Sequence, residues 1–188
     1  MLAVPLNSYS SDRQQGQSQR PCQIFSLFAS VTLAGLLFGC TIQTTNQYEA
    51  TARTTYTWQV RYYANQSRRD KDERLESLVS TSLVNRNGEK PESAVIGPDD
   101  KGLWWPAIPP KPLLDEIEKR QRPYETASPP ELLQKVEYQI SYNNGEKIVS
   151  LPTNHDVYRE VAKAYPTRTP LELTLGVEDR SVEKAEPR

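Results

Sequence analysis

An apolar run over residues 24–38 limits most strongly what this chain can fold into. It lies within a longer window, residues 21–48, that contains no charged side chain. Fifteen helical residues reach about 22 Å, short of the roughly 30 Å hydrocarbon core of a bilayer, but they suit the apolar region of a signal peptide. Upstream, Arg13 and Arg20 outweigh Asp12, so the positive-inside rule keeps the N-terminus in the cytoplasm and exports the remainder. The run therefore divides the chain into a targeting segment and an exported body.

The end of this run resembles the lipobox of bacterial lipoproteins. In Leu37-Phe38-Gly39-Cys40, a leucine stands three residues before the cleavage point, a small residue precedes it and a cysteine follows it, although Phe38 is larger than the usual residue there. The resemblance implies that a diacylglyceryl group is attached to the Cys40 sulfur and that a peptidase cuts between Gly39 and Cys40. The new amine is then usually acylated. Acyl chains that bury methylenes at about 0.8 kcal/mol each provide stable anchoring when two or three are present.

Two other interpretations of the apolar run stay open on the sequence. The uncharged polar flank through Thr45 could extend the run to a spanning length with some tilt, which would give an uncleaved anchor helix. The run could also be an ordinary signal peptide cut at a small residue, with Cys40 incidental. All three interpretations place residues 49–188 outside the cytoplasm.

Proline and charge divide the exported body further. All thirteen prolines after Cys40 lie beyond Gly88, and the small, uncharged residues 41–47 are typical of a flexible tether. The predicted signal peptide covers residues 1–39, with its n-region over 1–23 and its apolar region over 24–38. A lipidated cysteine and flexible tether follow over 40–49. A single domain is expected over 50–178, with a proline-rich insert over 89–130, and a charged, frayed tail over 179–188.

Alternation of apolar and polar residues predicts the strands of this domain. Residues 55–63 place aromatic and branched side chains on one face, which favours a strand with one buried face. Residues 136–151 alternate around Asn144-Gly145, which predicts a hairpin with a tight turn. Residues 171–177 predict a last strand.

Spacings of three and four residues predict the helices. Apolar residues at this spacing predict a helix over 69–84, and a short helix is expected after Pro112. A helical turn is expected from Pro129-Pro130. Thr153, with an acidic residue three positions later, predicts the N-terminal cap of a helix that ends before Pro166.

The order of these elements predicts an α+β fold. A strand and a helix come first, and after the insert come two strands, a helix and a strand. Because each strand has one apolar face, we expect a two-layer sandwich of an antiparallel sheet of about four strands with helices on one face. This pattern matches the ferredoxin-like βαββαβ arrangement with a long proline-rich insert.

Few side chains of the exported body suggest catalysis or metal binding. Cys22 and Cys40 are the only cysteines and His155 is the only histidine, so a zinc site or a histidine triad would depend on one residue. His155 is expected on the surface in the first turn of a helix. Asp99 and Asp100 lie in a proline-rich loop, which indicates a turn. We predict neither a cofactor nor a metal site.

The most unusual stretch of the body is GLWWPAIPPKP, residues 102–112. Trp104 and Trp105 precede Pro106, Pro109 and Pro112, which recur every three residues as on one edge of a polyproline II helix. The two tryptophans could fold back over the open face of the sheet and close the core. Alternatively, they could form an exposed anchor for a partner protein or for the bilayer interface.

These features predict a non-catalytic, lipid-anchored accessory or binding protein of a membrane or envelope complex, on the extracytoplasmic side. The formal net charge of −1, without a long run of one sign, gives no electrostatic footprint for nucleic acid. The expected partners are the membrane, through the lipid, and a protein, through residues 104–112 or an open sheet edge. The alternatives are a single-pass subunit with an uncleaved helix and an envelope hydrolase that uses carboxylates such as Asp99, Asp100 or Asp115.

Overall fold

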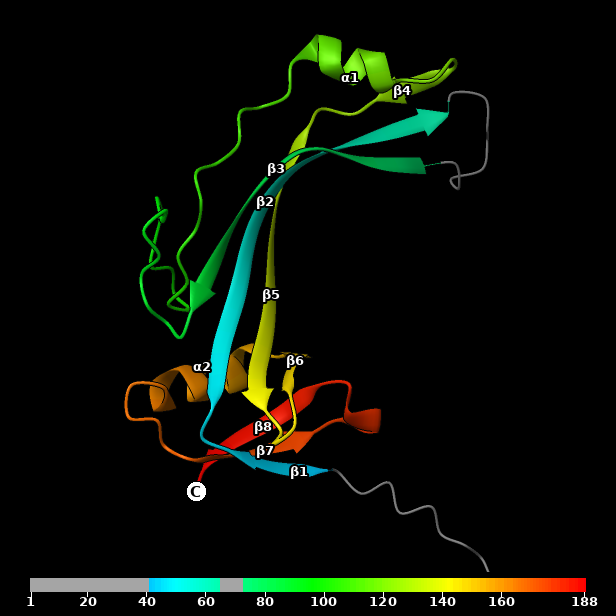
Figure 1. Ribbon diagram of the computed structural model, residues 1–188. Helices are drawn as coiled ribbons and strands as arrows, with labels where there is room; N and C mark the ends of the chain where they lie inside the picture. The colour runs from blue at the N-terminus through cyan, green and yellow to red at the C-terminus, as the bar shows by residue number, and fades with distance from the viewer. Residues whose placement is uncertain (1–40, 65–72) are drawn as a thin grey trace, which may run out of the picture. The chain divides into compact units, whose positions relative to one another are not determined.

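A single long strand, β2 (Tyr48–Ala64), organises the fold (Figure 1). The computed structural model describes residues 41–64 and 73–188. Their eight strands form one sheet in the order β1-β7-β8-β6-β5-β2-β3, with β4 also paired to β2. Every pairing is antiparallel except that of β6 with β8. The other elements are β1 (Ile42–Thr45), β3 (Glu73–Arg86), α1 (Leu114–Arg120), β4 (Glu125–Ala127), β5 (Glu131–Asn143), β6 (Ile148–Thr153), α2 (His155–Ala164), β7 (Leu171–Leu175), η1 (Val177–Asp179) and β8 (Val182–Pro187).

The predicted α+β class is confirmed, but the four-stranded sandwich is wrong. The sheet has eight strands and is mixed rather than antiparallel. The ferredoxin-like order also fails, because the element that follows β2 is a strand, β3, and not a helix.

The helix predicted over residues 69–84 is therefore wrong where the structure describes it. β3 pairs with β2 from Glu73 opposite Tyr63 to Arg86 opposite Thr51. A bulge interrupts the pairing: Val79 lies opposite Trp58, but the next position of β2 lies opposite Ser77. One extra residue reverses the alternation of faces, so apolar residues on either side of the bulge acquire a helix-like spacing.

The predicted hairpin over residues 136–151 is confirmed as β5 and β6. Its turn has four residues between the paired Asn143 and Ile148, and the Asn144 N–H donates to the Lys147 carbonyl (3.1 Å). The strand over 55–63 is confirmed as part of β2. The strand predicted over 171–177 is confirmed as β7, but it is not the last, because β8 follows it. The helical turn expected from Pro129-Pro130 is wrong, because β5 begins at Glu131 and pairs with β2 from there.

The two helices predicted after Pro112 and after Thr153 are confirmed, with one change of cap. α1 follows Pro112, as expected. The cap of α2 is Asn154, whose Oδ1 accepts from the Val157 N–H (3.0 Å). Thr153 ends β6, and its hydroxyl donates to the Val182 carbonyl instead (2.6 Å).

The flexible tether and the frayed tail are both wrong where the structure describes them. Residues 42–45 form β1 on β7, and the Thr41 carbonyl accepts from the Leu175 N–H (2.8 Å). The charged C-terminal residues form β8, which also pairs with β7. Val182 and Ala185 of β8 are buried while the charged residues beside them are exposed, so this strand combines an apolar side with a charged one.

One face of β2 is covered by three elements in succession. Near its start, Tyr48 and Ala50 pack with α2 in the larger hydrophobic core. In the middle, Tyr56 contacts Trp105 and therefore lies under residues 102–112, called the proline-rich segment below. Near its end, Tyr62 packs against α1 in a small second core. α2 and α1 thus lie beside opposite ends of β2 (Figure 1). On the other face, polar side chains such as Thr57, bonded to Ser80 (2.9 Å), face solvent.

Candidate functional site

The proline-rich segment is fixed to the sheet by its backbone at Trp104. The buried side chain of Asn85 accepts from the Trp104 N–H (2.8 Å) and donates to the Trp104 carbonyl (2.9 Å). The Thr54 hydroxyl donates to the same carbonyl (2.8 Å). Because Thr54 and Asn85 are buried polar residues of neighbouring strands, these bonds satisfy groups that would otherwise destabilise the core.

Trp105 folds back over the sheet, which was the first of the two predicted alternatives for the tryptophans. Its ring is buried and lies 5.0 Å from the Tyr56 ring, and its Nε1–H donates to Asp99 Oδ2 (2.8 Å). Trp104 is half-buried, with Lys90 Nζ 5.0 Å from its ring. Trp105 therefore closes the core over the sheet, whereas the ring of Trp104 stays half-buried.

The three-residue repeat of prolines has a structural counterpart. Pro106, Pro109 and Pro112 are buried, whereas the residues between them are exposed. Sheet side chains bind the carbonyls of this run: Thr81 donates to Ala107 (2.7 Å), and the Trp58 Nε1–H donates to Pro109 (2.9 Å). The repeat thus presents one edge to the sheet and the other edge to solvent.

The carboxylates considered for catalysis are not brought together. Asp99 Oδ1 accepts from the backbone N–H groups of Lys101 (3.0 Å) and Leu103 (2.8 Å), and its Oδ2 holds Trp105, so both oxygens serve the turn. Asp100 is exposed in the same turn, whereas Asp115 is exposed on α1.

The separation of these acids follows from what they lie against. Asp99 lies near Tyr138, since its carboxylate raises the pKa of Tyr138, and Tyr138 is paired with Ala52 of β2. Asp115 belongs to α1, whose Ile117 carbonyl accepts a hydrogen bond from the Tyr62 hydroxyl of β2. Ala52 and Tyr62 are ten residues apart on β2, which corresponds to roughly 33 Å of strand.

A pocket of about 490 Å³ opens between the end of β3, the turn that follows Pro98, and α2. Gly88 forms one wall and Tyr158 another. Charged residues from both the turn and the helix surround its mouth. Its lining residues are Asn87, Gly88, Asp99, Asp100, Lys101, Gly102, Tyr158, Arg159, Ala162 and Lys163.

Beside this pocket, three aromatic side chains form a cluster with unpaired polar atoms. The Tyr138 ring lies 5.7 Å from His155 and 5.4 Å from Tyr158. Within the described part of the chain, Tyr138 Oη, Tyr158 Oη and His155 Nε2 are buried without a hydrogen-bond partner, although His155 Nδ1 lies 3.4 Å from Asp156. An unpaired buried polar group costs about 1–3 kcal/mol, so a water molecule or a ligand group would be stabilised here.

Burial accounts for the electrostatics of this cluster. It raises the pKa of Tyr158 above its usual range, and the Gly88 N–H, which is near the hydroxyl but lacks the geometry of a hydrogen bond, partly opposes this rise. Burial also raises the pKa of Tyr138, and the Asp99 carboxylate adds to this. The expected surface position of His155 is wrong, since its side chain is 25% exposed. Sequence reasoning missed Tyr158, although its place beside Val157 on the apolar side of α2 was a usable signal.

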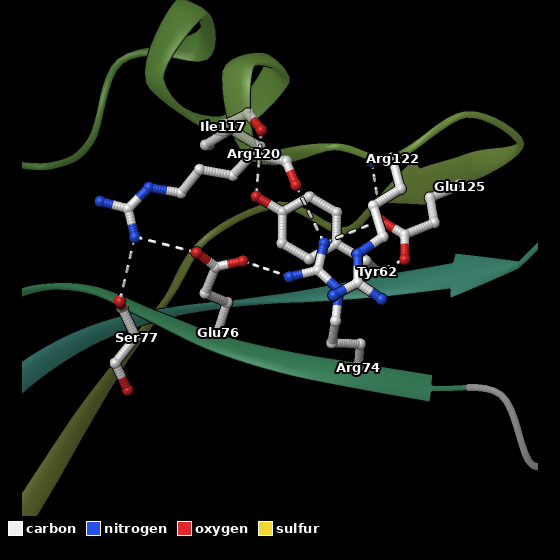
Figure 2. A network of polar contacts seen from close by, with 8 residues as sticks. All are labelled: Tyr62, Arg74, Glu76, Ser77, Ile117, Arg120, Arg122 and Glu125. Atoms are coloured by element: carbon white, nitrogen blue, oxygen red, sulfur yellow. Dashed lines mark hydrogen bonds and ion pairs between the residues drawn. The ribbon is translucent and has the colours of Figure 1, made fainter.

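A second polar network lies where α1 and β4 meet the far end of β2 and β3 (Figure 2). Arg74 donates to Glu125 (2.8 Å), to Glu76 and to the Arg120 carbonyl (3.0 Å). Its guanidinium also stacks 4.2 Å from the centre of the Tyr62 ring. Arg120 adds a bond to Glu76 (3.0 Å).

These contacts shift the pKa values of the network in a consistent direction. The Arg74 hydrogen bond and then the Arg122 backbone N–H lower the pKa of Glu125. For Glu76, desolvation alone would raise the pKa, but the hydrogen bonds from Arg74 and Arg120 outweigh it, so the pKa is lowered. In Figure 2, Arg74 pairs with Glu76 and Glu125, and Arg120 pairs with Glu76, which is typical of a structural network.

The lipobox-like motif, Cys40 and the apolar run over 24–38 lie outside the described residues. Over residues 41–64 and 73–188, no helix is both long and apolar enough to cross a bilayer, and no three acidic, histidine or cysteine side chains are placed to hold a metal ion. No protein-family model matches the chain, and neither a curated protein nor a solved structure is found to be similar to it.

Proposed function

We propose that this chain is a lipid-anchored, extracytoplasmic binding protein that serves, without catalysis of its own, as an accessory component of a membrane or envelope complex. One observation carries the proposal: the lipobox-like motif ends directly before the residue at which the folded sheet begins. Thr41 follows Cys40 and already bonds to Leu175 (2.8 Å). A cut between Gly39 and Cys40 would therefore leave all described strands of the sheet intact.

The protein partner would contact the outer edge of the proline-rich segment. Trp105, Pro106, Pro109 and Pro112 support this edge from beneath rather than meeting the partner. Ile108 and Leu114 are large aliphatic residues, 50% and 67% exposed, on a stretch that the buried prolines and the bonded carbonyls hold in place. A preformed apolar edge loses little conformational entropy on binding, which favours association.

The positions of the acids support a binding role over hydrolysis. Glycosidases place two carboxyl groups about 5–9.5 Å apart. Asp99 is engaged with the backbone of its own turn, and Asp115 lies on α1 at the other end of the long strand. We therefore rank the carboxylate-dependent hydrolase below the binding protein.

Mass spectrometry of the purified protein tests the anchor. We expect a mature N-terminus at Cys40 that carries acyl mass, and we expect Cys40→Ala to retain Gly39 and the apolar run over 24–38 without acyl mass. A wild-type chain that is full-length, unmodified and membrane-bound would favour the alternative single-pass subunit.

Photo-cross-linking in intact cells tests the partner surface. A cross-linker in place of Ile108 should yield a specific protein adduct, and Leu114→Ser should lower its yield. A cross-linker in place of Ile148, which is 75% exposed on β6, serves as the matched control and should not yield that adduct. The same adduct from both positions would remove this edge from the proposal.

A further inference from the structure

The two edge strands of the sheet differ in how they are protected. β3 carries charged side chains at both ends, Glu73, Arg74 and Glu76 at its start and Arg86 at its end. β1, the opposite edge, has none: residues 41–47 are uncharged and Ile42 is 59% exposed. Because a bare edge offers unpaired backbone groups to other strands, proteins protect it with charge, proline, a short edge strand or a covering element. β1 lacks charge and proline and is protected only by its length of four residues, so its backbone groups stay open to a covering layer.

We propose that the β1 edge lies in the headgroup layer of the membrane that holds the Cys40 lipid, with Ile42 and Val177 facing the lipid. The inference rests on the proposed function, since it requires an acylated Cys40. It specifies what the anchor does beyond attachment, because it sets which side of the folded body meets the bilayer.

The length of chain between lipid and sheet carries the argument. Cys40 is followed by Thr41, whose carbonyl bonds to Leu175 N–H, and by β1, which is paired from Ile42 onward. One residue spans at most about 3.6 Å, whereas a free segment over residues 41–47 would reach about 25 Å. An acylated cysteine therefore leaves the β1 edge no room to move away from the headgroups.

The residues around this point suit the headgroup layer rather than the hydrocarbon. Val177, two residues beyond Leu175, is 74% exposed and belongs to η1, while Glu178 and Arg180 beside it form an ion pair in water-accessible positions. Backbone groups on the open side of β1 need hydrogen-bond partners, which water and lipid headgroups provide and acyl chains do not. The edge is therefore expected to lie at the surface of the bilayer.

Site-directed spin labelling tests this placement. In the mature chain, Cys40 is the only cysteine and its sulfur is acylated, so one introduced cysteine gives one labelled position. Labels at Ile42 and Val177 are compared with labels at Ile148 and Leu114, which are similarly exposed. The lipidated protein is placed in vesicles of phosphatidylethanolamine and phosphatidylglycerol, after its acyl mass has been confirmed.

We expect the labels at Ile42 and Val177 to lose most of their accessibility to a water-soluble relaxing agent, while the labels at Ile148 and Leu114 keep theirs. A short Gly-Ser insertion after Cys40 should return the first pair to the control values. Equal accessibility at all four positions in acylated protein would overturn the inference and leave the proposed function standing. Protein without acyl mass would instead refute the proposed function and the inference with it.

A second copy of the chain is the other occupant that could cover this edge. The unlipidated mature chain, residues 40–188 with Cys40→Ser, is labelled at the same positions in the absence of vesicles and separates the two cases. We expect full accessibility and a monomeric mass. Protection at Ile42 together with a dimeric mass would show that β1 pairs with another copy, and the membrane placement would be wrong.

Discussion

Tyr62 on β2 and Tyr158 on α2 are both buried, near opposite ends of the long strand β2. They differ in whether the hydroxyl group is hydrogen-bonded. The Tyr62 hydroxyl donates to the Ile117 carbonyl (3.0 Å) within a network in which each charge has a partner. The Tyr158 hydroxyl has no hydrogen-bond partner and lies beside two further unpaired polar atoms and a pocket. The first arrangement is typical of structural stabilisation, whereas the second leaves room for a molecule that supplies the absent hydrogen bonds.

The largest effect is expected from the apolar centre beneath α1. Ile117 is 4% exposed and belongs to a small core with Val60 and Tyr62. Ile117→Ala should lower the free energy of unfolding by about 2–4 kcal/mol, because it removes buried methylenes and leaves a cavity. Hydrogen exchange should show the loss first in α1 and β4. A variant as stable as wild type in urea would contradict a packed core at this end.

A matched pair of tyrosine substitutions tests the comparison itself. Tyr62→Phe should cost about 1 kcal/mol, since it deletes a formed hydrogen bond, whereas Tyr158→Phe should cost nothing or stabilise the protein. Urea denaturation of both variants provides the measurement. Equal losses would mean that the Tyr158 hydroxyl already has a partner, such as an ordered water molecule.

Acid should loosen the α1 end before the α2 end. Arg74 lowers the pKa of Glu125, and Arg74 with Arg120 lowers that of Glu76. A carboxylate whose folded pKa is depressed stabilises the protein above its unfolded pKa, about 4.3 for Glu, and loses that contribution as pH falls through the folded pKa. Amide exchange in α1 and β4 should therefore accelerate below about pH 4.

Arg74→Gln is the control for the acid effect. It should weaken this end of the sheet at neutral pH and remove most of the added acid sensitivity. The same acid response in Arg74→Gln would show that the network does not set the pH dependence.

The smallest effect is expected in an alkaline titration. Burial raises the pKa of Tyr158 and of Tyr138, so both should ionise above the usual range of tyrosine. Neutral tyrosine is the form that the fold favours, and its contribution to stability is lost as pH rises through the folded pKa. The absorbance change of Tyr158→Phe should lack part of the late phase and keep the early phase unchanged.

Local patterns in the sequence predicted the elements that obey one period throughout. Most of β2, the β5–β6 hairpin, both α-helices and β7 belong to this group. β3 and β8 were not predicted, because each contains one extra residue at which its pairing with the neighbouring strand shifts. The extra residue is Leu78 in β3 and Glu183 in β8. A bulge reverses the faces of a strand, and only the partner strand specifies where it occurs.

The functional features were predictable to different degrees. The return of Trp105 to the sheet was one of two alternatives, and the proline repeat correctly indicated a segment with two edges. The Arg74 network was not predictable, because its members come from β3, α1 and β4 and meet only through pairing of distant strands. The unpaired cluster around Tyr158 likewise depends on how α2 packs against β5.

The most direct test of the central claim is the mass of the N-terminal peptide of the native, membrane-extracted protein. If the anchor has been assigned correctly, that peptide begins at Cys40 and carries a diacylglyceryl thioether on its sulfur. A peptide that still contains Gly39, or a free thiol at Cys40, would contradict it.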